Sequence, residues 1–230
     1  KKMSKTQEVS MKNPLMAGFP NHSFGKWKDI LIKNNYTIIK IEQDSHGTKD
    51  PNREVTEVIS PGVNLDTTCF SNNIMSIYLE EFKDHNTSKN ILQIGISIID
   101  VTTGESSVYE THSSPDDYNY SLDEIFRFIG SFNPAEIIIH LVNTCLTKEK
   151  LENYLQIYQY QVHYNIYSSP KYNYLLQNKY KDEILDKVYK NRGNLSPVEF
   201  ISMEKMHFSL NSFIYLIEFV YEHNENIIQK

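Results

Sequence analysis

Cysteine is scarce in this sequence, and the histidines follow no metal-binding pattern. Only two cysteines occur, Cys69 and Cys145, and there is no Cys-x-x-Cys pair. This usage favours a reduced, intracellular protein over one with a structural disulfide. The eight histidines show no i, i+3 or i+4 pair and no adjacent cysteine, so we expect no metal site.

Long apolar runs are also absent. No run of about 18 apolar residues occurs, so we expect no transmembrane helix and no membrane partner. The first residues, KKMSKTQEVSMKNP, are basic but lack an apolar core, which argues against a secretory signal. The chain begins with Lys rather than Met, and we expect it to be a fragment of a longer protein. The cytoplasm or a viral factory, the nucleus and the mitochondrion all stay open as its compartment.

Positive charge is not in excess. Lysine and arginine number 23 against 29 acidic residues, a net charge of −6. Non-specific affinity for nucleic acid depends on phosphate neutralisation, so this charge argues against binding over the whole surface, although it does not exclude a local basic patch. A P-loop is missing as well, because Gly25-Lys26 is followed by Trp27 where an ATPase needs Ser or Thr. Any ATP chemistry would therefore belong to residues outside this chain.

The residues that are present describe an ordinary globular protein of one or two domains, with 40% hydrophobic residues over a length of 230. Residues 15–60 predict a small α/β unit that opens on a Met-Ala-Gly-Phe-Pro turn. Ser23 is placed to cap a helix on which Phe24, Trp27 and Leu31 share one face. Two strands follow, at residues 36–41 and 53–60, joined by a polar loop and ended by a Ser-Pro-Gly turn.

A second α/β unit is predicted from about residue 72. Its strands are expected at residues 74–82, 90–101, 106–111, 136–141 and 161–167, although a short helix is the alternative for the first of these. Ser121 and Glu124 form a capping-box pattern at the start of one helix, and residues 146–159 predict another. Three adjacent strands followed by helix, strand, helix and strand are typical of a ribonuclease-H-like fold. Further helices are expected at residues 172–191, from Ser196 onward, and at residues 209–228.

Several of these segments resemble the MutS family of DNA mismatch repair proteins. MAGFPNHS, YTIIKIEQ and REVTEVISPGVNLD are similar, in order and spacing, to the second half of the mismatch-recognition domain. GISIIDVTTGE and SFNPAEIII are similar to parts of the ribonuclease-H-like connector domain. The apolar stretch FIYLIEFVYEHNENII resembles the first of the lever and core helices. The resemblance implies a mismatch-recognition part at 1–66, a connector domain at 67–190, and the start of the lever and core helices at 191–230.

This resemblance implies a function for the longer protein. We expect a clamp-like homodimer that binds mispaired or looped double-stranded DNA and signals repair through an ATPase, with ATP and magnesium as cofactors outside this chain. The connector would relay the nucleotide state and offer a surface to a downstream repair protein. We expect no catalytic residue here, and the family's Phe-x-Glu mismatch reader does not occur in the chain. Composition and the segment YEHNENIIQK favour the branch of giant viruses and coral mitochondria.

The candidate DNA-binding residues lie in the first unit. In the family, the turn that corresponds to Met16, Ala17, Gly18, Pro20 and His22 lies close to the DNA, and a glycine allows close backbone approach. The alternative is a turn that only packs against its sheet. Among the cations, Lys26, Lys49 and Arg53, together with Lys28 and Lys33, are candidates for phosphate contacts, although a solvated surface is their usual place.

Two other functions stay open. One is a protein-interaction module without a role on DNA. The other is a metal-dependent nuclease, since nucleases of the ribonuclease-H-like fold gather carboxylates around two metal ions. Its candidates would be Glu80, Glu81, Asp100 and Glu105, but Asp100 precedes a Thr-Thr-Gly turn, where aspartate is a routine turn former.

Overall fold

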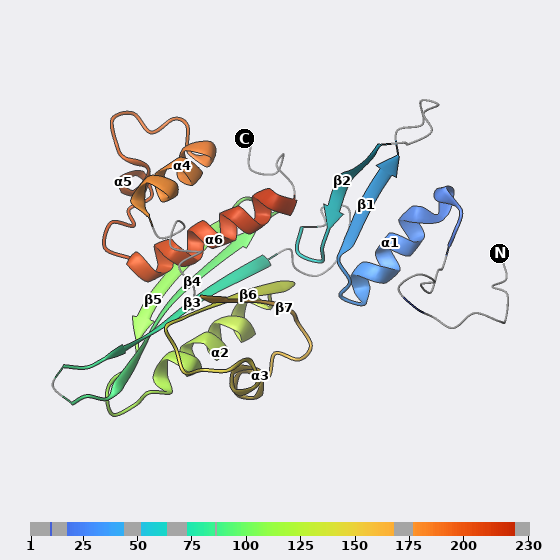
Figure 1. Cartoon of the computed structure of the whole chain (residues 1–230). Coiled ribbons are helices and arrows are strands. Elements are labelled where there is room, and N and C mark those ends of the chain that lie inside the picture. Colours follow the sequence, from blue (N-terminus) through green and yellow to red (C-terminus); the bar gives the residue numbers. More distant parts are fainter. Residues whose placement is uncertain are drawn as a thin grey trace.

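The structure is a computed structural model that describes residues 10, 18–43, 52–63, 73–85, 87–167 and 177–223. It contains an N-terminal α/β unit and a five-stranded sheet with helices on both faces (Figure 1). The N-terminal unit consists of the 3-10 turn η1 (Asn21–Ser23), helix α1 (Phe24–Lys33), and strands β1 (Ile38–Gln43) and β2 (Arg53–Ile59). None of the helices among the described residues is long and apolar enough to cross a membrane.

Strands β1 and β2 form a separate two-stranded antiparallel sheet, from Ile38 opposite Ile59 to Gln43 opposite Arg53. The register shifts once, between Lys40 and Ile41. Helix α1 ends with Asn34 as its C-cap and Asn35 in the left-handed conformation. Ser23 is the N-cap residue, but its side chain makes no capping hydrogen bond.

The second unit is built on a mixed sheet with the strand order β5-β4-β3-β6-β7. Strand β4 is antiparallel to both β5 and β3, whereas β6 runs parallel to both β3 and β7. All five predicted strands are confirmed, including the first one as a strand rather than a helix. Their bounds are β3 (Asn73–Lys83), β4 (Asn90–Asp100), β5 (Ser106–His112), β6 (Glu136–Val142) and β7 (Gln161–Tyr167).

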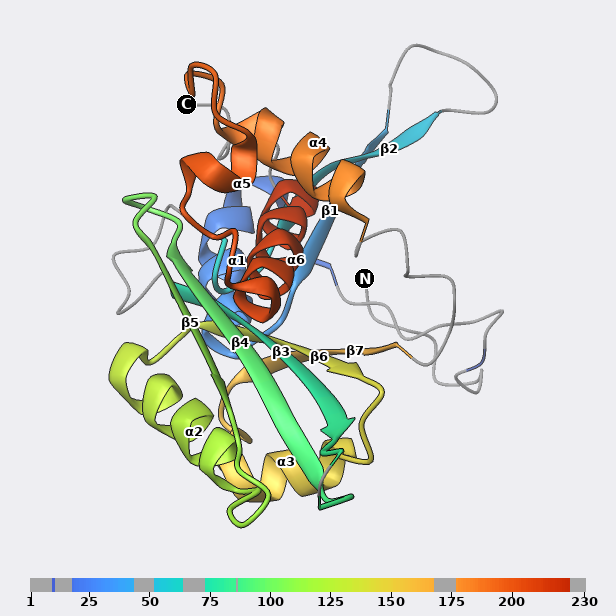
Figure 2. The same cartoon turned by 90° about the vertical axis from the view of Figure 1, so that its left-hand side faces the viewer.

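The two faces of this sheet are covered by different helices. Helices α2 (Tyr120–Phe132) and α3 (Lys148–Leu155) lie on one face, and α6 (His207–His223) crosses the other (Figures 1 and 2). Alternate residues of a strand point to opposite faces. Ile77 of β3 therefore packs in the cluster beneath α2 and α3, while Ile74 packs in the cluster beneath α6. Helices α4 (Asn178–Val188) and α5 (Pro197–Phe200) extend the α6 layer.

Helix α6 approaches the sheet closely at its first turn. A Cβ atom on Gly95 of β4 would lie 2.1 Å from the backbone carbonyl of Phe208, so only glycine fits there. Glu110 of β5 accepts hydrogen bonds from the backbone N–H groups of Phe208 and Ser209 at 2.8 and 2.9 Å. This carboxylate satisfies the free amides of the first turn and complements the helix dipole.

The helix ends differ from the sequence prediction. The predicted Ser121–Glu124 capping box is wrong, because α2 begins at Tyr120, and Asp117 rather than Ser121 accepts an amide of the first turn, that of Tyr120, at 3.1 Å. Ser121 instead donates to the carbonyl of Leu92 at 2.9 Å, and Glu124 accepts from Arg127. The capping box of α5 is present, formed by Ser196 and Glu199. Helix α3 is shorter than the predicted range 146–159. The start predicted at residue 172 for one later helix and the end predicted at residue 228 for another lie outside the described residues.

Candidate nucleic-acid interface

The predicted DNA-facing turn leads directly into α1. Gly18, Pro20 and His22 are all exposed. The turn closes on a hydrogen bond of 2.9 Å from the amide of Ser23 to the carbonyl of Pro20. A Cβ atom on Gly18 would meet nothing within 4 Å, so the space above this backbone is open. Met16 and Ala17 lie outside the described residues.

Exposed cations lie on and near α1. Lys26, in its first turn, and Lys33, in its last turn, are exposed and form no ion pair with another described residue. Lys28 is half-buried. Arg53 is exposed at the first position of β2, and Lys49 lies outside the described residues.

The topology of the unit brings several of these residues to one end. Helix α1 runs back alongside β1, so the start of α1 and the far end of the hairpin lie at the same end of the unit (Figure 1). Gly18, Pro20, His22 and Lys26 are at the start of α1, and Arg53 is at the far end of the hairpin. The first turn of α1 contains no acidic residue. A helix N-terminus with free amides and neighbouring cations attracts phosphate, so this end of the unit suits a polyanion.

An exposed aromatic pair lies beside the turn, and the sequence analysis did not anticipate it. Phe19 and Trp27 stack with ring centroids 5.8 Å apart and planes inclined by 23°. Their side chains are 44% and 40% exposed, and the helical spacing predicted only that Trp27 shares a face with Phe24 and Leu31. Ile32 is the buried residue of α1. Exposure of this kind depends on what packs against the helix, so the local pattern carried no signal for it.

One face of the hairpin is also apolar and exposed. Ile39 and Ile41 of β1 and Val55 of β2 are each about 60% exposed. Ile41 lies directly opposite Val55 in the register, and Ile39 lies opposite the half-buried Val58. The bulge after Lys40 keeps these side chains on a common face. This surface suits a macromolecular partner rather than water alone.

The carboxylates considered for a nuclease do not come together. Glu80 lies opposite Gln93, and Asp100 lies opposite Asn73, so the two acids are at opposite ends of the β3–β4 pair, roughly 20 Å apart. Asp100 accepts the backbone N–H of Thr102 at 2.8 Å, as expected of a turn former. Within the described residues, no three His, Cys, Asp or Glu side chains form a group that could hold a metal ion.

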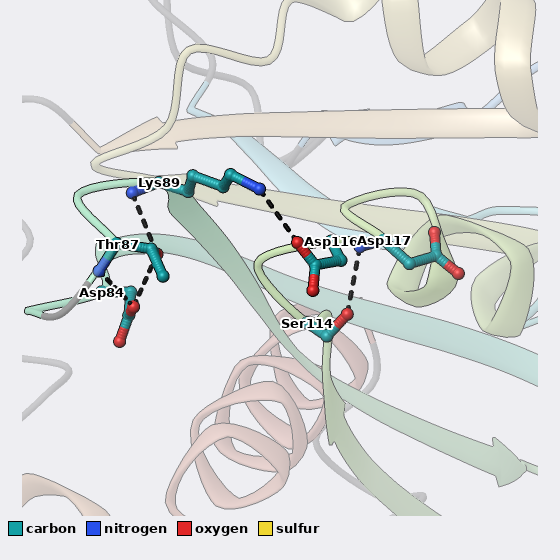
Figure 3. A network of polar contacts seen from close by, with 6 residues as sticks. All are labelled: Asp84, Thr87, Lys89, Ser114, Asp116 and Asp117. Atoms are coloured by element: carbon teal, nitrogen blue, oxygen red, sulfur yellow. Dashed lines mark hydrogen bonds and ion pairs between the residues drawn. The ribbon is translucent and has the colours of Figure 1, made fainter.

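A second surface feature lies where β3 ends and β4 begins. A shallow pocket of about 440 Å³ is lined by Glu81, Lys89, Tyr118 and Cys145, among others. Glu81 accepts the hydroxyl of Tyr118 and the amide of Cys145, and burial raises the pKa of Tyr118. Figure 3 shows the polar contacts around this end, including the hydrogen bond that Nζ of Lys89 donates to Oδ1 of Asp116 at 2.9 Å. The loops that form the rim of the pocket are thus held in place by their own side chains.

Comparison with known proteins shows what parts of the chain are similar to. Residues 1–68 match the family described as MutS domain I. The chain is 28% identical over 215 residues, 85% of its length, to a mutS homolog of Acanthamoeba polyphaga mimivirus, of which it covers 19%. It is 30% identical over 149 residues, 61% of its length, to DNA mismatch repair protein MutS of Salinibacter ruber, of which it covers 14%. A third relative, MutS of Fusobacterium nucleatum, is 35% identical over 98 residues, which are 41% of this chain and 10% of that protein.

These matches relate the chain to DNA mismatch repair proteins. Residues 1–68 match the MutS family model, and the chain spans between 10% and 19% of the three relatives. Among solved structures, the simian T-cell lymphotropic virus intasome in complex with a PP2A regulatory subunit is similar over 58% of this chain and 46% of its own. Its identity is 20% and its TM-score is 0.29, which supports no argument about fold or function.

Proposed function

We propose that this chain is part of a MutS-type protein that binds mispaired or looped duplex DNA, and that the start of α1 and the far end of the hairpin face the duplex. The observation that carries this proposal is the match of residues 1–68 to MutS domain I. It is supported by the open space at Gly18 and by the exposed cations Lys26 and Arg53 at the same end of the unit. The resemblance adds Met16, Ala17 and Lys49 to this surface.

The five-stranded sheet is the proposed connector domain, with a ribonuclease-H-like fold. Its support is the strand order, in which three antiparallel neighbours are followed by two strands reached through α2 and α3. We keep the divisions at 1–66, 67–190 and 191–230 as a proposal. The division 1–66 ends between β2 and β3, which belong to two separate sheets. The division 191–230 contains α6, which packs on the connector sheet.

The longer protein would act as a homodimer whose ATPase, with ATP and magnesium, lies outside these residues. In this scheme the connector passes the nucleotide state to the DNA-binding part and offers a surface to a downstream repair protein. The similarity to the mimivirus relative supports placement in the branch of giant viruses and coral mitochondria. The proposed site of action is the cell interior, where such DNA would be found.

A gel-shift titration tests DNA binding directly. The chain is titrated against matched, mismatched and looped duplexes at two salt concentrations. We expect weak binding that falls steeply with salt, because the contacts proposed for this chain are mainly to phosphates. Preference for the mismatch should appear only in a longer protein that includes the upstream Phe-x-Glu motif. A longer protein without that preference would refute the proposal.

Matched variants locate the interface. Lys26→Ala should weaken binding about equally for all duplexes and reduce the salt slope by about 1, as expected for one phosphate contact. Lys83→Ala, which removes an exposed lysine at the far end of β3, is the control and should change neither quantity. Trp27 is the only tryptophan in the chain, so its fluorescence reports binding near the turn. Equal effects of the two lysine variants would place the DNA elsewhere.

A protein-interaction module without a role on DNA is the second candidate. The exposed apolar face of Ile39, Ile41 and Val55 favours it, because such a surface suits a protein partner better than a phosphate backbone. The same titration separates the two functions. No binding to any duplex at low salt, by either the chain or the longer protein, would favour the interaction module.

A further inference from the structure

The N-terminal unit has little core of its own. Among the residues described between 18 and 63, the buried apolar side chains are Ile32, Ile59 and Val63. Val63 packs in the cluster beneath α6 rather than within the unit. A two-stranded hairpin is only marginally stable by itself in water. Contacts with the rest of the chain must therefore set the position of the unit.

One of these contacts is a buried carboxylate. Glu136, the first residue of β6, is 0% exposed. Ser60, which follows β2 and is also fully buried, donates its hydroxyl to Oε2 of Glu136 at 2.8 Å. Nε2 of His163, on β7, lies 3.6 Å from Oε1. A buried carboxylate requires donors, and the end of the hairpin supplies a close one.

A second attachment of the unit reaches the same carboxylate through Gln161 of β7. Thr37, just before β1, lies 2.8 Å from the Gln161 amide. With the amide nitrogen facing Glu136, that nitrogen is 3.3 Å from Oε1 and 3.2 Å from the carbonyl of Asn35. This orientation satisfies both ends of the amide. Asn35 also donates its side-chain amide to the carbonyl of Gln159 at 3.2 Å.

The surroundings leave this junction little freedom. A Cβ atom on Gly62 would lie 2.6 Å from Cγ1 of Ile74 and 3.0 Å from Oε2 of Glu136, so residues 60–62 pass closely over the carboxylate. On the other side, the ring of His163 contacts Phe219 of α6, with centroids 5.1 Å apart. Glu136 thus lies where the hairpin, the sheet and α6 meet.

We propose that Glu136 is a positioning residue that fixes the N-terminal α/β unit on the five-stranded sheet. Ser60 and Gln161 are its two links to that unit. Through them, the carboxylate sets where the turn at Gly18–His22 stands relative to α6. The effect on DNA depends on the proposed function, whereas the junction itself is tested without DNA.

Hydrogen exchange of the 230-residue chain tests the junction. Glu136→Ala removes the acceptor, and we expect the amides of β1 and β2 to lose roughly tenfold to a hundredfold in protection, as for loss of a charged buried hydrogen bond. Glu136→Gln retains one oxygen and should have a smaller effect. The amides of β3 and β4 should keep their protection. Glu124→Gln, at a buried acid bonded to Arg127, is the control and should leave β1 and β2 unchanged.

A distance measurement gives a readout that core stability does not affect. Spin labels are placed at Glu57 on β2 and Glu149 on α3, both exposed, in a chain whose two cysteines are replaced by serine. The wild-type junction should give a narrow distance distribution, and Glu136→Ala a broad one. Ser60→Ala should also broaden the distance distribution. The double variant should broaden it by less than the sum of the two single effects, because both changes remove the same hydrogen bond.

Two results would overturn the proposal. In the first, protection falls equally in both sheets, which would make Glu136 a residue of general stability. In the second, neither protection nor distance changes in Glu136→Ala. Failure of the DNA titration with an intact junction would refute the proposed function alone. If Glu136→Ala does not fold, Glu136→Gln and Ser60→Ala decide by the same criteria.

Discussion

His140 makes a specific prediction about stability and pH. It lies within β6, where all residues are buried, and its ring stacks on Tyr215 of α6 with centroids 4.0 Å apart. Nδ1 is 3.5 Å from the side-chain amide nitrogen of Asn165. Burial lowers the pKa of His140 to about 3. The folded protein therefore keeps this imidazole neutral under ordinary conditions.

The sign and size of the effect follow from linkage. Between about pH 6.5, the ordinary pKa of histidine, and pH 3, the unfolded chain binds a proton on His140 and the folded chain does not. Acidification over this interval therefore favours the unfolded chain. Above the interval the side chain is neutral in both states and contributes nothing to the pH dependence. From pH 7.5 to pH 5.0 the loss of unfolding free energy is about 2 kcal/mol.

Urea unfolding at the two pH values measures this loss. His140→Gln removes the titrating group, so its unfolding free energy should fall by about 2 kcal/mol less than that of the wild type between pH 7.5 and pH 5.0. The variant is expected to be less stable at both pH values, but only the difference between them is the readout. His85→Gln, at an exposed turn residue, is the control and should follow the wild type.

One result would refute the reasoning. If wild type and His140→Gln lose the same free energy on acidification, His140 is not held neutral by burial. The other histidines are the same in both proteins, so their contributions cancel in the comparison. If the His85→Gln control loses less unfolding free energy on acidification than the wild type does, exposed groups contribute to the pH dependence, and the reasoning fails as well.

Further predictions concern the docking of α6. Gly95→Ala places a Cβ atom against the backbone of Phe208, so we expect a loss of about 1–3 kcal/mol in unfolding free energy, measured by urea denaturation. Gly130→Ala is the matched substitution on α2, where a Cβ atom meets nothing within 4 Å, and it should stabilise by up to about 1 kcal/mol; the same sign for both would contradict the geometry. Glu110→Gln removes the charge that accepts two amides at the start of α6 and should cost about 1 kcal/mol. That loss should shrink at high salt, and an unchanged loss would indicate a hydrogen bond without a contribution from the helix dipole.

The strands were predictable because their signals are local. Ile94, Ile96 and Ile98 belong to one run of β-branched residues between turn formers, and that run forms β4. The Asp100 turn and the α5 capping box were predictable for the same reason, since each needs only neighbouring residues. Ser121 shows the limit of this reasoning. Its pattern predicts a cap, but the carbonyl of Leu92, on another strand, is the partner it bonds.

The candidate interface was predictable only in part. The family resemblance pointed to Gly18, and positive charge pointed to Lys26, as candidates for DNA contact. Both are exposed, and their contact with DNA stays a prediction. It did not indicate the stacked, exposed pair of Phe19 and Trp27. The role of Glu136 had no sequence signal at all, since an acid at the start of an apolar strand usually faces water.

The sequence by itself determined the family resemblance, the order of the strands along the chain, and most of the turns, because these depend on residue types within a few positions of one another. Tertiary structure alone decided which strand lies beside which, and that α6 approaches Gly95 and is capped by Glu110. It also decided that His140 is buried and that Ser60 reaches Glu136. These contacts join residues far apart in the sequence, and their energies depend on burial and on distance in space, which no local pattern encodes.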